Sequence, residues 1–144
     1  MHDTGLPIAS QDQPAAVSER EREIAELVHR FYANVQADAV LGPVFDRNVA
    51  DWDAHLANMC DFWSSAVYRT GRYAGRPLEA HRRIAELRAA HFPRWLRLWT
   101  QTVDEVVRSD ASAQLKDLAT RMASSMSSRL GLLPDSAPEW GSAT

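Results

Sequence analysis

Apolar residues recur along this chain at the spacing of helices rather than with the alternation of strands. Between residues 18 and 36 they form a stripe that comprises Ile24, Leu27, Val28, Phe31 and Val35. Positions three and four apart share one face of an α-helix. Ser18 and Glu21 have the spacing of a capping box, in which two side chains satisfy free amides of the first turn. We therefore predict a helix that starts at Ser18 and buries this stripe.

Three later stretches have the same periodicity. The first follows Asp51, a suitable N-cap, and ends between residues 68 and 71; the second starts near Phe92, with Pro93 in its first turn; the third follows a cap at Ser109 or Asp110 and ends at Gly131. Their expected inward positions are Trp52, His55, Met59, Phe62, Trp63 and Ala66, then Phe92, Trp95, Leu96, Trp99, Val103 and Val106, then Leu115, Leu118, Ala119, Met122, Met126 and Leu130.

Two short segments separate these helices. Gly42 and Pro43 should turn the chain and leave Phe45 in an irregular or one-turn segment that reaches inward. After the loop TGRYAGRP, Pro77 suits the first position of a short helical piece that carries His81. About four principal helices, with no strand pattern and no repeat, place the chain in the all-α class.

The chain is long enough for one domain with its own core. Residues 1–17 contain prolines and polar residues without periodicity, and we expect a flexible leader there; residues 18–133 form the predicted domain and residues 134–144 a flexible tail.

Charge and composition exclude several function classes. The net charge of −3 and a pI near 5.9 argue against a nucleic-acid partner. The single cysteine, Cys60, cannot form an internal disulfide and fits a reducing compartment. The sequence has neither a secretion signal nor an apolar run that could span a membrane. These features predict a cytoplasmic protein without membrane attachment.

Aromatic residues are abundant for so small a helical protein, with five tryptophans and four phenylalanines. This excess around a histidine is compatible with a flat apolar cofactor, although on composition alone a bulky core is the simpler explanation. On the residues alone, His81 is more simply an exposed or hydrogen-bonded histidine than a metal ligand, and His91, which also precedes an aromatic helix, lies at a helix start, which favours a surface or capping role. His29 and His2 should be exposed. The spacings of the histidines and Cys60 do not match a zinc site.

Four segments together resemble a known family. FYANVQADAVLGPVF, DWDAHLANMCDFWSSAV, YAGRPLEAH and HFPRWLRLW, in this order and spacing, are similar to the group III truncated haemoglobins, the bacterial two-over-two globins. The resemblance spans roughly residues 18–133. It implies a truncated globin fold, a two-over-two helical sandwich with a very short proximal helix.

The resemblance also implies roles for individual residues. His81, in the Pro-Leu-x-x-His segment, would be the proximal ligand of a haem b iron. Tyr32, His55 and Trp95 would form the distal side, where diatomic ligands bind. Residues expected to contact the cofactor, besides His81 and Trp95, are Phe45, Met59, Phe62, Phe92 and Met122. Arg76, Arg82 and Arg83 lie near the expected ligand and are either partners of haem propionates or simply solvated.

The implied function is binding of dioxygen, nitric oxide, carbon monoxide or peroxide at a five-coordinate iron with a polar distal pocket. Hydrogen-bond donors such as Tyr32 and Trp95 slow the release of a ligand, and slow release favours chemistry on the ligand over bulk oxygen transport. The alternative is a redox enzyme, nitric-oxide-dioxygenase-like or peroxidase-like, served by an unidentified reductase. A haem-free helical interaction module is the less favoured alternative.

Overall fold

The computed structural model describes the backbone of residues 5–132 and the side chains from Ser18 to Leu132. His2 and the expected tail, residues 134–144, lie outside this part. The described residues form six helices: α1 (Gly5–Ala37), α2 (Leu41–Asn48), α3 (Trp52–Tyr68), α4 (Pro77–Arg82), α5 (His91–Val106) and α6 (Ser112–Arg129). The described chain contains no strand, which confirms the all-α class.

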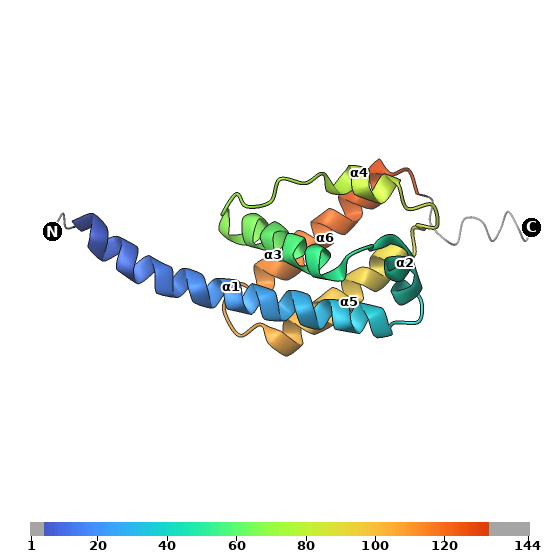
Figure 1. Ribbon diagram of the computed structural model, residues 1–144. Coiled ribbons are helices and arrows are strands. Elements are labelled where there is room, and N and C mark those ends of the chain that lie inside the picture. The colour runs from blue at the N-terminus through green and yellow to red at the C-terminus, as the bar shows by residue number, and fades with distance from the viewer. Residues whose placement is uncertain (1–4, 133–144) are drawn as a thin grey trace, which may run out of the picture.

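Two pairs of long helices build the body of the fold. Helix α1 packs against α3, α5 packs against α6, and the two pairs join where α1 crosses α5 (Figure 1). The predicted two-over-two sandwich is therefore confirmed. Helix α4 is the very short proximal helix of the prediction, and it lies beyond α3 and next to the end of α6.

The first helix starts earlier than the sequence indicates. Helix α1 begins at Gly5, so residues 5–17, expected as an irregular leader, are helical. Ser18 therefore lies inside a helix and cannot cap one. Glu21, its expected capping partner, accepts a hydrogen bond from the Ser64 hydroxyl at 2.7 Å instead.

The core forms where the stripes of α1, α3, α5 and α6 meet. All five predicted positions of α1 are buried with 0–1 % exposure, and so are Trp63 and Trp99 at 2 % and 0 %. The Trp63 and Trp99 rings stack with their centroids 4.2 Å apart, which joins α3 to α5. The Trp99 indole N–H donates to the Leu115 carbonyl at 3.2 Å, which joins α5 to α6.

The other element boundaries are partly as predicted. Asp51 caps α3 as expected, with its side chain accepting from the Ala54 amide at 3.1 Å. Gly42 and Pro43, expected as a break, lie inside α2, because Asp38 accepts from the Val40 and Leu41 amides and starts the helix there. Helix α6 starts at Ser112, so neither predicted cap is its N-cap.

Gly42 belongs to α2 for a steric reason as well. A Cβ at this position would lie 2.7 Å from the Gln36 carbonyl oxygen, so only glycine lets α2 approach the end of α1 this closely.

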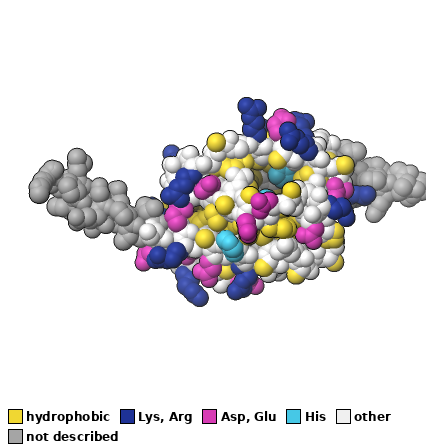
Figure 2. Space-filling model, in the orientation of Figure 1, with side chains coloured by type: hydrophobic (Ala, Val, Ile, Leu, Met, Phe, Trp, Pro, Cys, Tyr) yellow, Lys and Arg dark blue, Asp and Glu magenta, His cyan; other side chains and the backbone are white. Residues whose placement is uncertain are grey.

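Acidic and basic side chains are interspersed over the face shown in Figure 2. This mixed surface agrees with the slightly negative net charge and shows no continuous basic patch on that face.

Candidate functional site

His81 is held in one orientation by its own helix. Pro77 opens α4, and its carbonyl lies 2.6 Å from Nδ1 of His81, one turn later. Because a carbonyl only accepts, Nδ1 carries a proton, and in the neutral ring the lone pair is therefore on Nε2. A backbone carbonyl on one nitrogen is the arrangement that orients an imidazole to bind a metal through the other.

His55 is the second imidazole of the site. It lies on α3, and its Nε2 is the one buried side-chain nitrogen or oxygen of the described residues without a hydrogen-bond partner. Burial lowers the pKa of His55 first, and the charge of His81 nearby lowers it further. The His55 ring is therefore neutral near pH 7, and the protein's own described groups leave its enclosed Nε2 without a hydrogen bond.

Tyr32 lies against His55 in an edge-to-face contact, with ring centroids 4.9 Å apart. Its side chain is 5 % exposed, and burial alone raises the pKa of the phenol far above its usual value. Unlike His55 Nε2, the Tyr32 hydroxyl is not fully enclosed, and it makes no hydrogen bond within the described residues. Tyr32 is therefore a neutral donor whose hydrogen bond is still available.

Two further aromatic rings complete this cluster. Phe45 of α2 lies 5.7 Å from the Tyr32 ring and 6.4 Å from the His55 ring, and Trp52 lies 5.9 Å and 5.6 Å from the same rings. Phe45 reaches inward as the sequence predicts. Trp52 was assigned to the inward face of α3 but to no site, and its place directly before the Asp-x-His segment was the signal available.

Trp95 lies on the α5 side of the same region. Its ring is parallel to that of Trp99 at 6.0 Å and edge-on to Phe31 at 5.9 Å, and Phe31 in turn contacts Tyr32 at 4.9 Å. The Trp99 indole N–H is bonded to Leu115, whereas that of Trp95 has no partner among the described residues. The two indoles thus differ in role: Trp99 is a core residue and Trp95 offers a donor.

A cavity of about 480 Å³ lies between α3, α4 and α6. Phe62, Leu78 and Met122 line it with the apolar side chains of Pro77, Leu118 and Met126, and with Ser125, Arg121 and Arg129 at its polar parts. This volume is in the range of small-molecule sites. Phe62 and Met122 were expected at the cofactor; Leu78, Leu118 and Met126 were not, although Leu78 stands in the Pro-Leu-x-x-His segment.

Two other residues that were expected to contact the cofactor lie outside this cavity. Met59 is partly buried and packs on the core, and Phe92 is half-buried in the first turn of α5. Neither lines that cavity.

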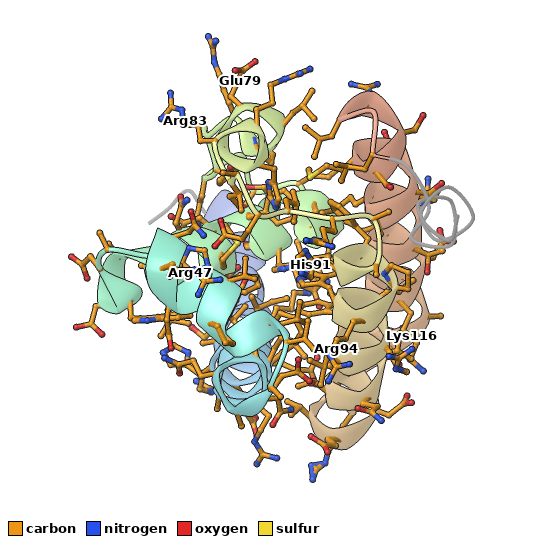
Figure 3. All side chains as sticks on the ribbon, turned by 90° about the vertical axis from the view of Figure 1, so that its right-hand side faces the viewer. Arg47, Glu79, Arg83, His91, Arg94 and Lys116 are labelled. Carbon is orange, nitrogen blue, oxygen red and sulfur yellow. The ribbon has the colours of Figure 1, made fainter. Side chains whose placement is uncertain are left out.

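The remaining polar candidates are at the surface. His91 Nδ1 accepts from the Arg88 backbone amide at 2.9 Å, which agrees with a capping role, and His29 is exposed. Arg76, Arg82 and Arg83 are exposed, and Glu79 and Arg83 extend away from α4 into solvent (Figure 3). Among the described residues, no group of histidine, cysteine and acidic side chains could hold a metal by itself.

Cys60 is half-buried against the core. Burial, then the carboxylates of Asp61 and Glu21, raise the pKa of its thiol, which makes it a poor nucleophile.

An ion pair fastens α2 to the loop between α4 and α5. Arg47 Nε donates to Glu86 Oε2 at 2.8 Å, and the Asn48 amide donates to the same oxygen at 3.3 Å. The contact holds the helix of Phe45 next to the segment that follows His81. It lies at the surface, so its energetic contribution is small and its role is geometric.

Comparison with known proteins agrees with this arrangement. Residues 16–128 match the model of a family described as bacterial-like globin. A group 3 truncated haemoglobin, ctb of Campylobacter jejuni, is 28 % identical over 108 residues, which cover 72 % of this chain and 85 % of that protein. The crystal structure of a group III truncated haemoglobin from Campylobacter jejuni superposes with a TM-score of 0.71 at 28 % identity, covering 76 % of this chain and 90 % of the other. Within the described residues, none of the helices is long and apolar enough to cross a membrane.

Proposed function

The chain belongs to the bacterial-like globin family, and on this basis we propose that it is a haem b protein that binds dioxygen and other diatomic ligands in a polar pocket. The proposed use is chemistry with dioxygen, nitric oxide or peroxide rather than bulk oxygen transport. The proposal rests mainly on the two imidazoles: His81, oriented by the Pro77 carbonyl, and His55, whose buried Nε2 has no hydrogen-bond partner among the described residues.

The residues present fit a haem. A porphyrin needs an apolar, flat-walled space, one neutral imidazole for the iron, and polar groups on the opposite side. In the proposal His81 Nε2 is the iron ligand, and Phe45, Phe62 and Met122 pack on the macrocycle. Bound there, haem would supply an iron with one open position for a diatomic ligand.

The distal residues have separate tasks in this proposal. The Tyr32 O–H and the Trp95 indole N–H have no hydrogen-bond partner among the described residues. Each can therefore donate to a small ligand that carries partial negative charge. Each such bond contributes about 1 kcal/mol, somewhat more in a dry pocket. At 1.4 kcal/mol apiece, each donor would slow ligand release about tenfold. His55, kept neutral by burial, adds a third polar contact without a cation.

Haem retention tests the ligand assignment. We expect His81→Ala to lose most of its haem on desalting, because the imidazole is the only proposed bond to the iron, while the matched variant His91→Ala keeps it. The ratio of Soret to protein absorbance measures both. Equal retention in the two variants would contradict the assignment of His81.

Ligand release tests the distal pocket. In Tyr32→Phe, which keeps the ring and removes the hydroxyl, dioxygen should dissociate about tenfold faster, since one hydrogen bond is lost. Stopped-flow replacement of dioxygen by carbon monoxide measures the rate. Trp52→Phe, which changes a neighbouring ring, should alter the rate much less. An unchanged rate in Tyr32→Phe removes that hydroxyl from the pocket.

The second candidate function is a redox enzyme, either nitric-oxide-dioxygenase-like or peroxidase-like. The unsatisfied donors favour it, because the same protons stabilise charge that develops on a reacting oxygen. Mixing the oxygenated protein with nitric oxide separates the two: rapid, stoichiometric nitrate formation supports the enzyme, and slow exchange without nitrate supports a binding protein. Turnover would also require a reductase that returns the oxidised protein to its reduced form.

A further inference from the structure

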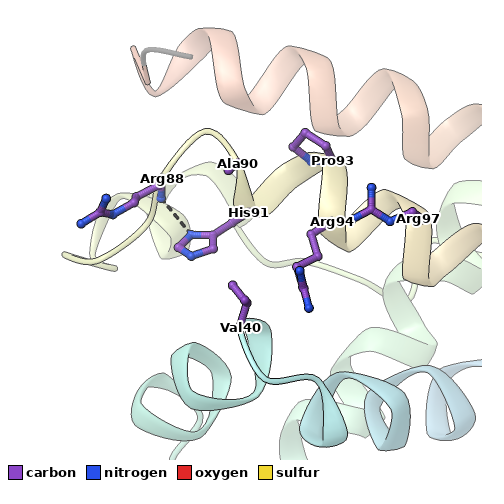
Figure 4. A pocket seen from close by; sticks show the side chains of 7 residues that line it. All are labelled: Val40, Arg88, Ala90, His91, Pro93, Arg94 and Arg97. Carbon is purple, nitrogen blue, oxygen red and sulfur yellow. Dashed lines mark hydrogen bonds between the residues drawn. The ribbon is translucent and has the colours of Figure 1, made fainter. Parts of the chain in front are cut away.

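A second cavity, of about 440 Å³, lies at the start of α5 and away from the residues assigned above. Arginine dominates its lining, with Arg88, Arg94 and Arg97, and Val40 and Pro93 supply apolar surface (Figure 4). In Figure 4, Arg88 lies on one side of His91, and Arg94 and Arg97 lie along α5 on the other side. The cavity is therefore flanked by cations at both ends.

The positive charge of this cavity is only partly compensated. Arg94 Nε donates to Asp38 Oδ2 at 2.7 Å, and this bond is the main cause that lowers the pKa of the Asp38 carboxyl. The same oxygen, Asp38 Oδ2, also accepts from the Val40 and Leu41 amides, so three hydrogen bonds converge on it at the start of α2. Guanidinium carries five N–H donors, and this pair uses only one of those of Arg94.

Arg88 and Arg97 have no acidic partner in the part of the chain that the structure describes. Both side chains are exposed, and within the described residues neither forms an ion pair or a side-chain hydrogen bond. With Asp38 cancelling Arg94, the lining keeps two positive charges in a protein whose net charge is −3. This local sign is opposite to that of the whole chain.

The backbone around the cavity is well fixed. The Arg88 amide donates to His91 Nδ1 at 2.9 Å, and the His91 amide donates to the Arg88 carbonyl at 3.1 Å. These reciprocal bonds hold the turn that leads into α5. The cavity thus faces the first turn of a helix of 16 residues, where the helix dipole also favours negative charge.

We propose that this cavity binds a small organic anion that carries a carboxylate or a phosphate group. Both groups match the planar donor fork of arginine, which binds them in pairs of charge-assisted hydrogen bonds. Val40 and Pro93 would contact the carbon skeleton, and the volume suits a metabolite-sized ligand. The proposal concerns a different site from the haem pocket and does not depend on the proposed function.

Isothermal titration calorimetry of the purified protein tests this site. The probes are citrate, glycerol 3-phosphate and inorganic phosphate, each compared with sodium chloride at equal ionic strength. We expect one-to-one binding of at least one organic probe that exceeds the chloride control. Tighter binding of citrate identifies carboxylate as the preferred group, and tighter binding of glycerol 3-phosphate identifies phosphate. Heats equal to those of chloride for all three probes would overturn the proposal.

Two variants locate the binding. Arg97→Ala and Arg88→Ala should each weaken binding about tenfold, because each removes a charge-assisted contact from the ligand. Arg22→Ala, an exposed arginine of α1 outside the cavity, is the matched control and should bind as the wild type does. Unchanged affinity in both cavity variants would place any anion elsewhere and refute the site. Circular dichroism should show that both variants fold as the wild type does, because the side chains of Arg88 and Arg97 are exposed.

Discussion

The unsatisfied nitrogen of His55 leads to a prediction about stability that follows from the proposed role of this residue. A buried polar atom without a hydrogen bond costs about 1–3 kcal/mol, and a site that serves a ligand retains that cost. In the haem-free protein, His55→Leu removes the orphan while an apolar side chain still fills the space between the aromatic rings of Tyr32, Phe45 and Trp52.

The expected gain is at the lower end of that range. His55 is only partly buried, and leucine gives up the edge-to-face ring contacts, so we expect the free energy of unfolding to rise by about 1 kcal/mol. With a urea slope of about 2 kcal/mol per molar, the midpoint should move up by about 0.5 M without a change in slope. The melting temperature should rise by about 3 °C.

The effect of pH provides an independent check. Because burial lowers the pKa of His55 in the folded state, the unfolded chain binds the proton first as the pH falls below its usual pKa of about 6.5. Stability is therefore complete above that pH and decreases through the window between the usual and the lowered pKa. His55→Leu should lose less stability across this window than the wild type.

Urea unfolding followed by circular dichroism at pH 7.5 and at pH 5.5 measures both effects. His29→Leu, an exposed histidine of α1, is the control and should differ by less than about 0.5 kcal/mol. A lower midpoint in His55→Leu at pH 7.5 would refute the reasoning, because it would show that the imidazole stabilises the fold rather than being held at a cost.

Two further substitutions test contacts that fix the fold around the site. Ser64→Ala removes the buried hydroxyl that donates to Glu21 at 2.7 Å, and we expect the free energy of unfolding to fall by about 1–2 kcal/mol in urea titrations. The control Ser124→Ala, at an exposed position, should lower it by no more than about 0.5 kcal/mol. Equal losses in the two variants would show that the buried hydrogen bond does not stabilise the fold. Asp51→Ala removes the cap of α3 and should lower the free energy of unfolding by about 1 kcal/mol in the same assay. Asp51→Asn keeps a side-chain oxygen that can cap, so it should retain most of that free energy. Identical losses in the two variants would mean that the side chain does not cap the helix.

The helices were predictable because their apolar periodicity is strong. The stripes of α1 and α5 identified their buried faces, and the Asp51 cap and the first-turn proline of α4 identified two starts. The start of α1 was not predictable from caps, since Ser18 and Glu21 have the capping spacing but Glu21 is used by Ser64 from a distant helix. Such a tertiary contact has no local signature.

The site was predictable only in part. The resemblance to the truncated haemoglobins indicated His81, Tyr32, His55 and Trp95, and the structure brings Tyr32 and His55 together with Phe45 as neighbours. One fact depends on three-dimensional placement and could not be read from spacing: the absence of a partner for His55 Nε2 among the described residues. Trp52 joined the cluster for the same reason, because the tilt of α3 decides which of its inward residues meets Tyr32.

The isolation of α4 has a consequence for how the protein is assembled. The large apolar contacts lie among α1, α3, α5 and α6, and the segment from residue 69 to residue 90 adds little to them. This body can therefore fold before the wall that carries His81 is in place, and that wall can detach and reseat without global unfolding. A prosthetic group would then be inserted from the side after the four long helices have folded. Amide hydrogen exchange in residues 69–90 should accordingly be much faster than in those helices.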